Sequence, residues 1–215
     1  IKLSNVINSP KHTSAHPFIC IDSISGNELL YFSSDREGGF GGMDLWFSVF
    51  KEGQPQAPIN LGSIINSKGD EITPFYEKKT GLLYFSSDYH IGMGGFDIFK
   101  SKGALSSWSV PKNLGYPYNT GANDFNYIIA NEDEAYLTSN RKGSMTFKDL
   151  TCCNDIFLAR REIVQQEIVS EIIVENFESN VKIDILELLP LSLYFDNDHP
   201  NPRSISSVTH LTYPQ

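Results

Sequence analysis

The sequence of 215 residues lacks the features that mark several classes of protein. No uninterrupted apolar run is long enough to cross a bilayer, so no transmembrane helix is expected. The 17 lysines and arginines do not cluster and are outnumbered by 26 acidic residues, which leaves a net charge of −9. A nucleic-acid partner or an anionic membrane surface is therefore disfavoured.

Common catalytic and metal-binding motifs are missing as well. The sequence contains no H-E-x-x-H, no G-x-S-x-G and no Walker-type loop, and its five histidines are scattered. The three cysteines do not form a disulfide framework, because their number is odd. Cys152 and Cys153 are adjacent and cannot easily chelate one zinc ion. An adjacent-residue disulfide, buried thiols or, less favoured, a pairing with Cys20 remain open.

What the sequence does contain is an internal repeat of about 53 residues. From Tyr84 to Phe99, an aromatic run ends in Ser-Ser-Asp, and a glycine-rich turn leads to a second aromatic run. This pattern predicts a β-hairpin with a longer loop. Residues 31–46 repeat it 53 residues earlier, and residues 136–157 hold a third, altered copy. Asn-Leu-Gly at 60–62 also recurs 53 residues later, so chance is a poor explanation.

Each repeat predicts four short strands and no helix. In the second repeat the expected strands lie within 73–76, 82–87, 96–100 and 108–114. Four strands in a period of this length are typical of a β-propeller blade. We therefore predict an all-β fold of four-stranded antiparallel propeller blades, with three blades at about 4–62, 63–115 and 116–161, together forming a domain over 1–161.

The three blades do not make a whole propeller, which needs at least four. Further blades are expected upstream of Ile1, and the alternative is a short stack of blades closed by oligomerisation. Residues 162–188 mix acidic and β-branched residues and are predicted to be a linker. Apolar residues then alternate from Leu189 to Phe195, which predicts a strand, and a loop signal follows at 196–202. A second domain is expected to begin within 189–215.

One acidic or amide side chain per repeat stands where the second strand enters the glycine-rich loop: Asp35, Asp88 and Asn140. A second set begins the returning strand: Asp44, Asp97 and Asp155. Such side chains accept hydrogen bonds from backbone N–H groups two residues on, or from a facing loop, so we predict structural turn residues. The alternative is a calcium site made of Asp35 with Asp44, or Asp88 with Asp97. A catalytic role is not expected for these side chains, because a catalytic carboxylate would more often be unique than present once in every repeat.

The repeat resembles the TolB-like, WD-type propeller repeat of cell-envelope proteins. The resemblance rests on the Tyr-Phe-Ser-Ser-Asp run and the Gly-Gly-x-Asp closure at 31–46 and 84–99. The third copy departs from it, since Asn140 replaces the aspartate and the loop is longer. The Cys-Cys-Asn-Asp-Ile-Phe ending at 152–157 and Leu-Tyr-Phe-Asp-Asn-Asp at 193–198 are similar to Bacteroidetes proteins in which a propeller precedes an OmpA-like domain.

The resemblance implies a non-enzymatic scaffold or binding protein without a cofactor. It would be periplasmic or associated with the outer membrane, its propeller would bind envelope proteins, and the OmpA-like part would tether it to peptidoglycan through residues beyond this chain. Features that differ between the copies are expected to carry specificity: residues 36–38 against 89–91, and the long loop of the third copy that contains Cys152 and Cys153. The alternatives are a propeller that binds carbohydrate or calcium, and a hydrolase whose active residues lie in other blades.

Overall fold

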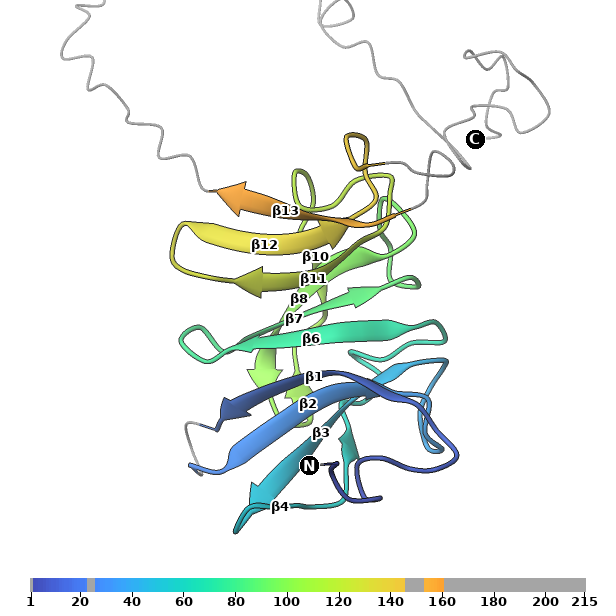
Figure 1. The fold of residues 1–215 in the computed structure, drawn as a ribbon, viewed down its shortest axis with the longest axis vertical. Coiled ribbons are helices and arrows are strands. Elements are labelled where there is room, and N and C mark those ends of the chain that lie inside the picture. The colour runs from blue at the N-terminus through green and yellow to red at the C-terminus, as the bar shows by residue number, and fades with distance from the viewer. Residues whose placement is uncertain (1, 23–25, 146–152, 161–215) are drawn as a thin grey trace, which may run out of the picture. The chain divides into compact units, whose positions relative to one another are not determined.

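The structure is a computed structural model that describes residues 2–22, 26–145 and 153–160. In these residues the chain forms antiparallel β-sheets and no helix (Figure 1). The all-β prediction is thus confirmed. The described sheets do not close into a barrel or a propeller ring, and no described helix is long and apolar enough to cross a membrane.

Three sheets follow one another along the chain. Sheet 1 contains β1 (Ser14–Ile21), β2 (Glu28–Ser34), β3 (Asp44–Lys51), β4 (Gln54–Pro55) and β5 (Ile59–Asn60). Sheet 2 contains β6 (Glu71–Glu77), β7 (Leu82–Ser87), β8 (Asp97–Ala104), β9 (Ser107–Trp108) and β10 (Lys112–Asn113). Sheet 3 contains β11 (Asp124–Ile129), β12 (Glu134–Ser139) and β13 (Asp155–Arg160).

The predicted fourth strand is divided in the structure. In sheet 1 both β4 and β5 pair with β3, and in sheet 2 both β9 and β10 pair with β8. Each of these pieces is only two residues long. Prolines at 55, 58 and 111 explain the interruption, because a proline has no backbone N–H to donate to the ladder. Sheet 3 has three described strands, and the predicted linker and second domain lie outside the described residues.

The sheets stack through the alternating faces of their central strands. Leu29 and Tyr31 of β2 point towards sheet 2, where Leu83 and Phe85 of β7 pack against them. Tyr84, on the opposite face of β7, packs on sheet 3. These side chains are fully or almost fully buried, and successive residues of one strand therefore belong to two different cores. This explains why the central strands read as continuous apolar runs.

A β-bulge interrupts the first strand of every sheet. The register shifts between Ala15 and Phe18 in β1, and equivalent shifts occur in β6 and β11. The bulged residues His16, Thr73 and Asn126 adopt left-handed φ values of 51°, 52° and 57°. For residues other than glycine this conformation carries strain of about 1–3 kcal/mol each. The three bulges therefore form a repeated feature that the sequence did not reveal.

Candidate functional site

The side chains predicted at the entrance to the glycine-rich loops each connect two loops. Each accepts a hydrogen bond from a backbone N–H that precedes the first strand of its sheet: Asp35 from Thr13 at 2.6 Å, Asp88 from Asp70 at 2.7 Å and Asn140 from Asn123 at 2.8 Å. We expected donors two residues on, but these donors lie 22, 18 and 17 residues earlier. The antiparallel pairing of the first two strands brings the two loops together.

The aspartates that begin the returning strands hold the glycine-rich loops. Asp44 accepts backbone N–H groups of Phe40 and Gly41 at 2.7 and 3.2 Å. Asp97 does the same for Met93 and Gly94 at 2.6 and 2.9 Å, and Asp155 accepts the Met145 N–H at 2.5 Å. Burial raises the pKa of Asp97, and the two backbone donors oppose that rise.

The loops are also joined from one sheet to the next. The Asp70 carboxylate accepts the Met43 N–H at 2.6 Å, and the Asn123 side chain accepts the Phe96 N–H at 3.0 Å. Sequence analysis missed Asp70 and Asn123, although their spacing of 53 residues could have revealed them. Together with Asp35, Asp88 and Asn140, they form a repeated set of hydrogen bonds between loops, which we call the loop belt. It gathers the glycine-rich loops of the three sheets at one end of their strands.

The four aspartates suggested for calcium, Asp35, Asp44, Asp88 and Asp97, all accept hydrogen bonds from backbone N–H groups. Within residues 2–22, 26–145 and 153–160, no group of three or more His, Cys, Asp or Glu side chains is arranged to hold a metal ion. Calcium needs six to eight oxygen ligands, so these paired aspartates do not by themselves form a ligand set.

Large apolar side chains project from the loop belt. Ile91 is 96% exposed, and Phe40, Met93, Met145 and other residues of these loops are also exposed. Single exposed apolar residues are ordinary, but here they recur in the same loop of all three sheets, on a backbone held by side-chain hydrogen bonds. Such loops on a rigid frame are suited to binding another molecule. We call the exposed residues Phe40, Tyr89, Ile91, Met93 and Met145 the loop edge.

Arg36 and His90, two of the side chains expected to carry specificity, form hydrogen bonds within the protein. The Arg36 guanidinium donates to the Ile7 carbonyl at 2.8 Å, and Arg141 donates in the same way to Tyr118 at 2.6 Å. In sheet 2, the His90 ring hydrogen-bonds with the equivalent carbonyl of Ile65 at 2.8 Å. Of the varied residues, Tyr89 and Ile91 are therefore better placed for recognition than Arg36 or His90.

The first residue of each first strand is polar, and its charge differs between the repeats. Asp124 in sheet 3 forms a buried ion pair with Arg141 at 2.7 Å. Ser14 occupies that position in sheet 1 and accepts a hydrogen bond from Arg36. Glu71 occupies it in sheet 2, where it is fully buried and no ion pair is formed by it within the described chain. Hydroxyl and backbone donors from Ser67 and Ser87 satisfy its oxygens instead.

The burial of Glu71 predicts that part of the free energy of unfolding depends on pH. Burial raises the pKa of Glu71 above its usual 4.5, although hydrogen bonds from Ser67 and Ser87 oppose the rise. The folded chain then holds this proton at a pH where the unfolded chain has lost it, so stability is lost as pH rises from 4.5 through the folded pKa. Glu71→Gln, which cannot titrate, should gain stability relative to the wild type over that range, by about 1.4 kcal/mol per pKa unit of the rise.

Urea unfolding of both chains from pH 4 to pH 8 measures this difference. Groups that titrate in both chains cancel, so only residue 71 contributes to the change. A difference that stays constant with pH would contradict the effect. Glu77→Gln, at the partly buried last position of the same strand, is the matched control for replacing a glutamate by glutamine.

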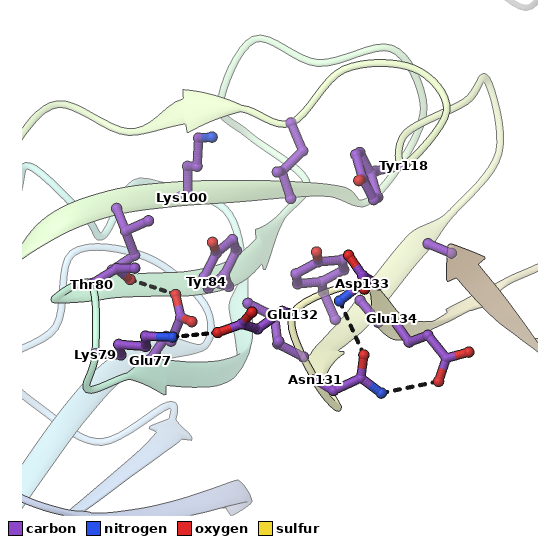
Figure 2. Close-up of a pocket in the computed structure, with 16 residues that line it drawn as sticks. Glu77, Lys79, Thr80, Tyr84, Lys100, Tyr118, Asn131, Glu132, Asp133 and Glu134 are labelled. Carbon is purple, nitrogen blue, oxygen red and sulfur yellow. Dashed lines mark hydrogen bonds and ion pairs between the residues drawn. The ribbon is translucent and has the colours of Figure 1, made fainter. Parts of the chain in front are cut away.

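A cavity of about 470 Å³ opens between sheets 2 and 3 (Figure 2). Carboxylates of Glu77, Glu132, Asp133 and Glu134 surround it, together with Lys79 and Lys100. Tyrosines 84, 118 and 127 form its apolar floor, with ring centroids of the first and last 5.0 Å apart. The Lys79–Glu132 ion pair at 2.6 Å spans the opening, but both side chains are exposed, so it contributes little stability.

A smaller cavity of about 250 Å³ lies where the three bulges meet. Three consecutive residues of each first strand line it: 16–18, 73–75 and 126–128. His16 hydrogen-bonds to the Ser33 hydroxyl at 2.7 Å, and burial lowers the pKa of that histidine. Ser33 is fully buried, and its hydroxyl donates to the Ala15 carbonyl. This serine–histidine pair is therefore not arranged as an accessible nucleophile and base.

Two of the three cysteines, Cys20 and Cys153, lie within the described residues. Cys20 has a free, partly buried thiol, and burial raises its pKa to about 11. Such a thiol is a poor nucleophile at neutral pH. Cys153 is exposed and has a left-handed φ of 73°, and Cys152 lies outside the described residues.

Comparisons with known proteins identify no relative: no family model, no curated protein and no solved structure matches the chain. The description of the protein therefore rests on its own geometry. The described residues form an all-β protein of three stacked antiparallel sheets, joined at one end by the loop belt.

Proposed function

We propose that the three sheets are blades of a β-propeller and that the protein is a non-enzymatic binding protein of the cell envelope. The repeated order of three long strands followed by short pieces on the third strand supports the blade assignment. The resemblance of the repeat to TolB-like propellers supports the envelope location. The OmpA-like domain expected from residue 189 would tether the protein to peptidoglycan.

The loop edge is the surface we assign to a protein partner. The observation that carries this assignment is that Ile91 and its neighbours are exposed on loops whose backbone is already fixed by buried aspartates. Little conformational entropy is then lost when a partner binds, and apolar side chains supply the contact area. The roles of the polar residues Asp44 and Asp97 in holding backbone argue for binding over catalysis.

The test uses the immobilised chain of 215 residues and a detergent extract of a Bacteroidetes outer membrane. The wild type should retain an envelope protein, and the double variant Ile91→Ser, Met145→Ser should retain at least about tenfold less. Val110→Ser is the matched control, because Val110 is 75% exposed but lies between β9 and β10, outside the loop edge. Equal retention by all three chains would exclude the loop edge, and no retained protein would argue against the binding function.

A further inference from the structure

Each first strand begins at a polar residue, and in sheets 1 and 3 an arginine of the glycine-rich loop donates a hydrogen bond to it. In sheet 3 the pair is Asp124 with Arg141, joined at 2.7 Å. In sheet 1 it is Ser14 with Arg36, joined at 3.2 Å. A guanidinium is always charged in proteins, so the positive charge at these two places does not change between pH 5 and pH 8.

Sheet 2 has a carboxylate and a histidine at these places. Glu71 is the first residue of β6 and is fully buried. The His90 ring hydrogen-bonds with the Ile65 carbonyl at 2.8 Å, as Arg36 and Arg141 do with the equivalent carbonyls. Because a carbonyl only accepts, Nε2 of His90 must donate, and a second proton would be taken up at Nδ1. An imidazole, unlike a guanidinium, can gain or lose that proton between pH 5 and pH 8.

Hydrogen bonds connect the Glu71 carboxylate to the loop that carries His90. The Ser87 hydroxyl donates to Glu71 at 2.7 Å and accepts the backbone N–H groups of Tyr89 and His90 at 3.1 and 3.3 Å. On the other side, Ser67 donates its N–H and its hydroxyl to Glu71 at 2.7 and 2.5 Å. The donors that surround the carboxylate thus hold two loops, and moving either loop would admit water to it.

The charge of His90 acts on Glu71. Burial raises the pKa of Glu71, while hydrogen bonds from Ser67 and Ser87 and the charge of His90 oppose the rise. A positive charge on His90 therefore stabilises the Glu71 carboxylate, and the carboxylate in turn favours the protonated ring. The two groups exchange this influence without an arginine of the kind that balances Asp124.

The other charged or titratable side chains around the pair have different contacts. Those of segments 40–44, 66–70 and 88–97 are Asp44, Lys68, Asp70, Asp88 and Asp97. The aspartates accept backbone N–H groups, and Lys68 is exposed. In the neighbouring first strands, Asp124 is paired with Arg141, and His16 hydrogen-bonds to Ser33.

We propose that Glu71 and His90 together hold one proton that keeps the loop at 88–96 in place, and that the loop opens more often when rising pH releases this proton to solvent. With the proton the pair is neutral overall, either as carboxyl and imidazole or as carboxylate and imidazolium. Without it a buried carboxylate faces an uncharged ring, and opening the loop relieves that cost by admitting water. The inference rests on contacts around sheet 2 and does not depend on the partner proposed for the loop edge.

Hydrogen exchange of the chain of 215 residues, followed by NMR from pH 5 to pH 8, tests the inference. Protection is corrected for the intrinsic pH dependence of exchange. For the Ser67, Tyr89 and His90 N–H groups it should fall by about tenfold, the linked effect of one pKa unit. The Thr120 and Arg141 N–H groups make the equivalent bonds in sheet 3 and should keep constant protection. An equal fall in both sheets, or no fall in sheet 2, would overturn the proposal.

Two variants separate the roles of the pair. Glu71→Gln has no carboxyl proton to release, so protection of the loop should no longer fall with pH. His90→Gln retains a side-chain N–H donor for the Ile65 carbonyl but cannot become charged, so the fall should occur at a lower pH than in the wild type. A fall that persists in Glu71→Gln, or an unchanged midpoint in His90→Gln, would contradict the shared proton. The comparison of sheets 2 and 3 in the wild type needs no variant and decides the matter if either variant fails to fold.

Discussion

Replacing Asp124 by alanine should lower the free energy of unfolding by about 3–5 kcal/mol, the cost of removing one partner of a buried ion pair. The Asp124 carboxylate is fully buried and accepts hydrogen bonds from Arg141, Ser139 and Thr120. The Arg141 side chain is only 17% exposed. Without Asp124 its guanidinium would keep carbonyl partners but lose its counter-ion. Urea unfolding followed by circular dichroism measures the change.

Two further variants show whether the buried charge is the cause. Lys79→Ala removes one partner of an ion pair of similar length whose side chains are 76% and 83% exposed, and it should cost less than about 1 kcal/mol. Asp124→Ser reproduces sheet 1, where Ser14 accepts a hydrogen bond from Arg36, and should cost less than Asp124→Ala. A loss for Asp124→Ala no greater than for Lys79→Ala would contradict the assigned role.

The sequence predicted the repeat, the all-β fold and most of the long strands, because their signals are local. The apolar and aromatic run from Leu82 to Ser87 predicts a strand without reference to distant residues, and β7 begins and ends at those residues. The turn before β7 also has a local cause, since Gly81 adopts a left-handed φ of 69°, which glycine permits. The bulges were missed because a left-handed Thr73 or Asn126 depends on the packing of three first strands together.

The loop belt could be predicted only in part. Period and residue type identified Asp35 and Asp88, but their partners depend on how the strands pair. Asp70 bonds to the preceding sheet at Met43, a contact that no motif in either segment indicates. The hydrogen bond of Arg36 could not be predicted for a similar reason, because its acceptor, the Ile7 carbonyl, lies in a different loop.

The repeated Asn66 and Asn119 acquire a role only in the structure, and Asn119→Ala should be as damaging as the loss of Asp124. Asn119 is fully buried. Its side chain accepts the Ile98 N–H at 2.8 Å and donates to the Ile98 carbonyl and to the Asn113 side chain, both at 2.8 Å. Alanine would leave the buried Ile98 N–H unpaired, at about 1–3 kcal/mol. It would also remove the hydrogen bonds to the Asn113 side chain and to the Ile98 carbonyl, which keeps the Leu114 N–H at 3.0 Å, at about 0.5–1.5 kcal/mol each. We expect a loss of about 3–5 kcal/mol in the free energy of unfolding.

Asn119→Asp separates lost hydrogen bonds from lost volume. Aspartate keeps the shape and the acceptor for the Ile98 N–H, but it sets a carboxylate oxygen against the Ile98 carbonyl and the Asn113 oxygen that the amide now donates to. If hydrogen bonding is the cause, Asp must destabilise about as much as Ala, since two acceptors then face each other in a buried site. Asn131→Ala, at an exposed turn, should cost less than about 1 kcal/mol. A stable Asn119→Asp protein would show that packing volume, and not the amide donor, holds the connecting segment against β8.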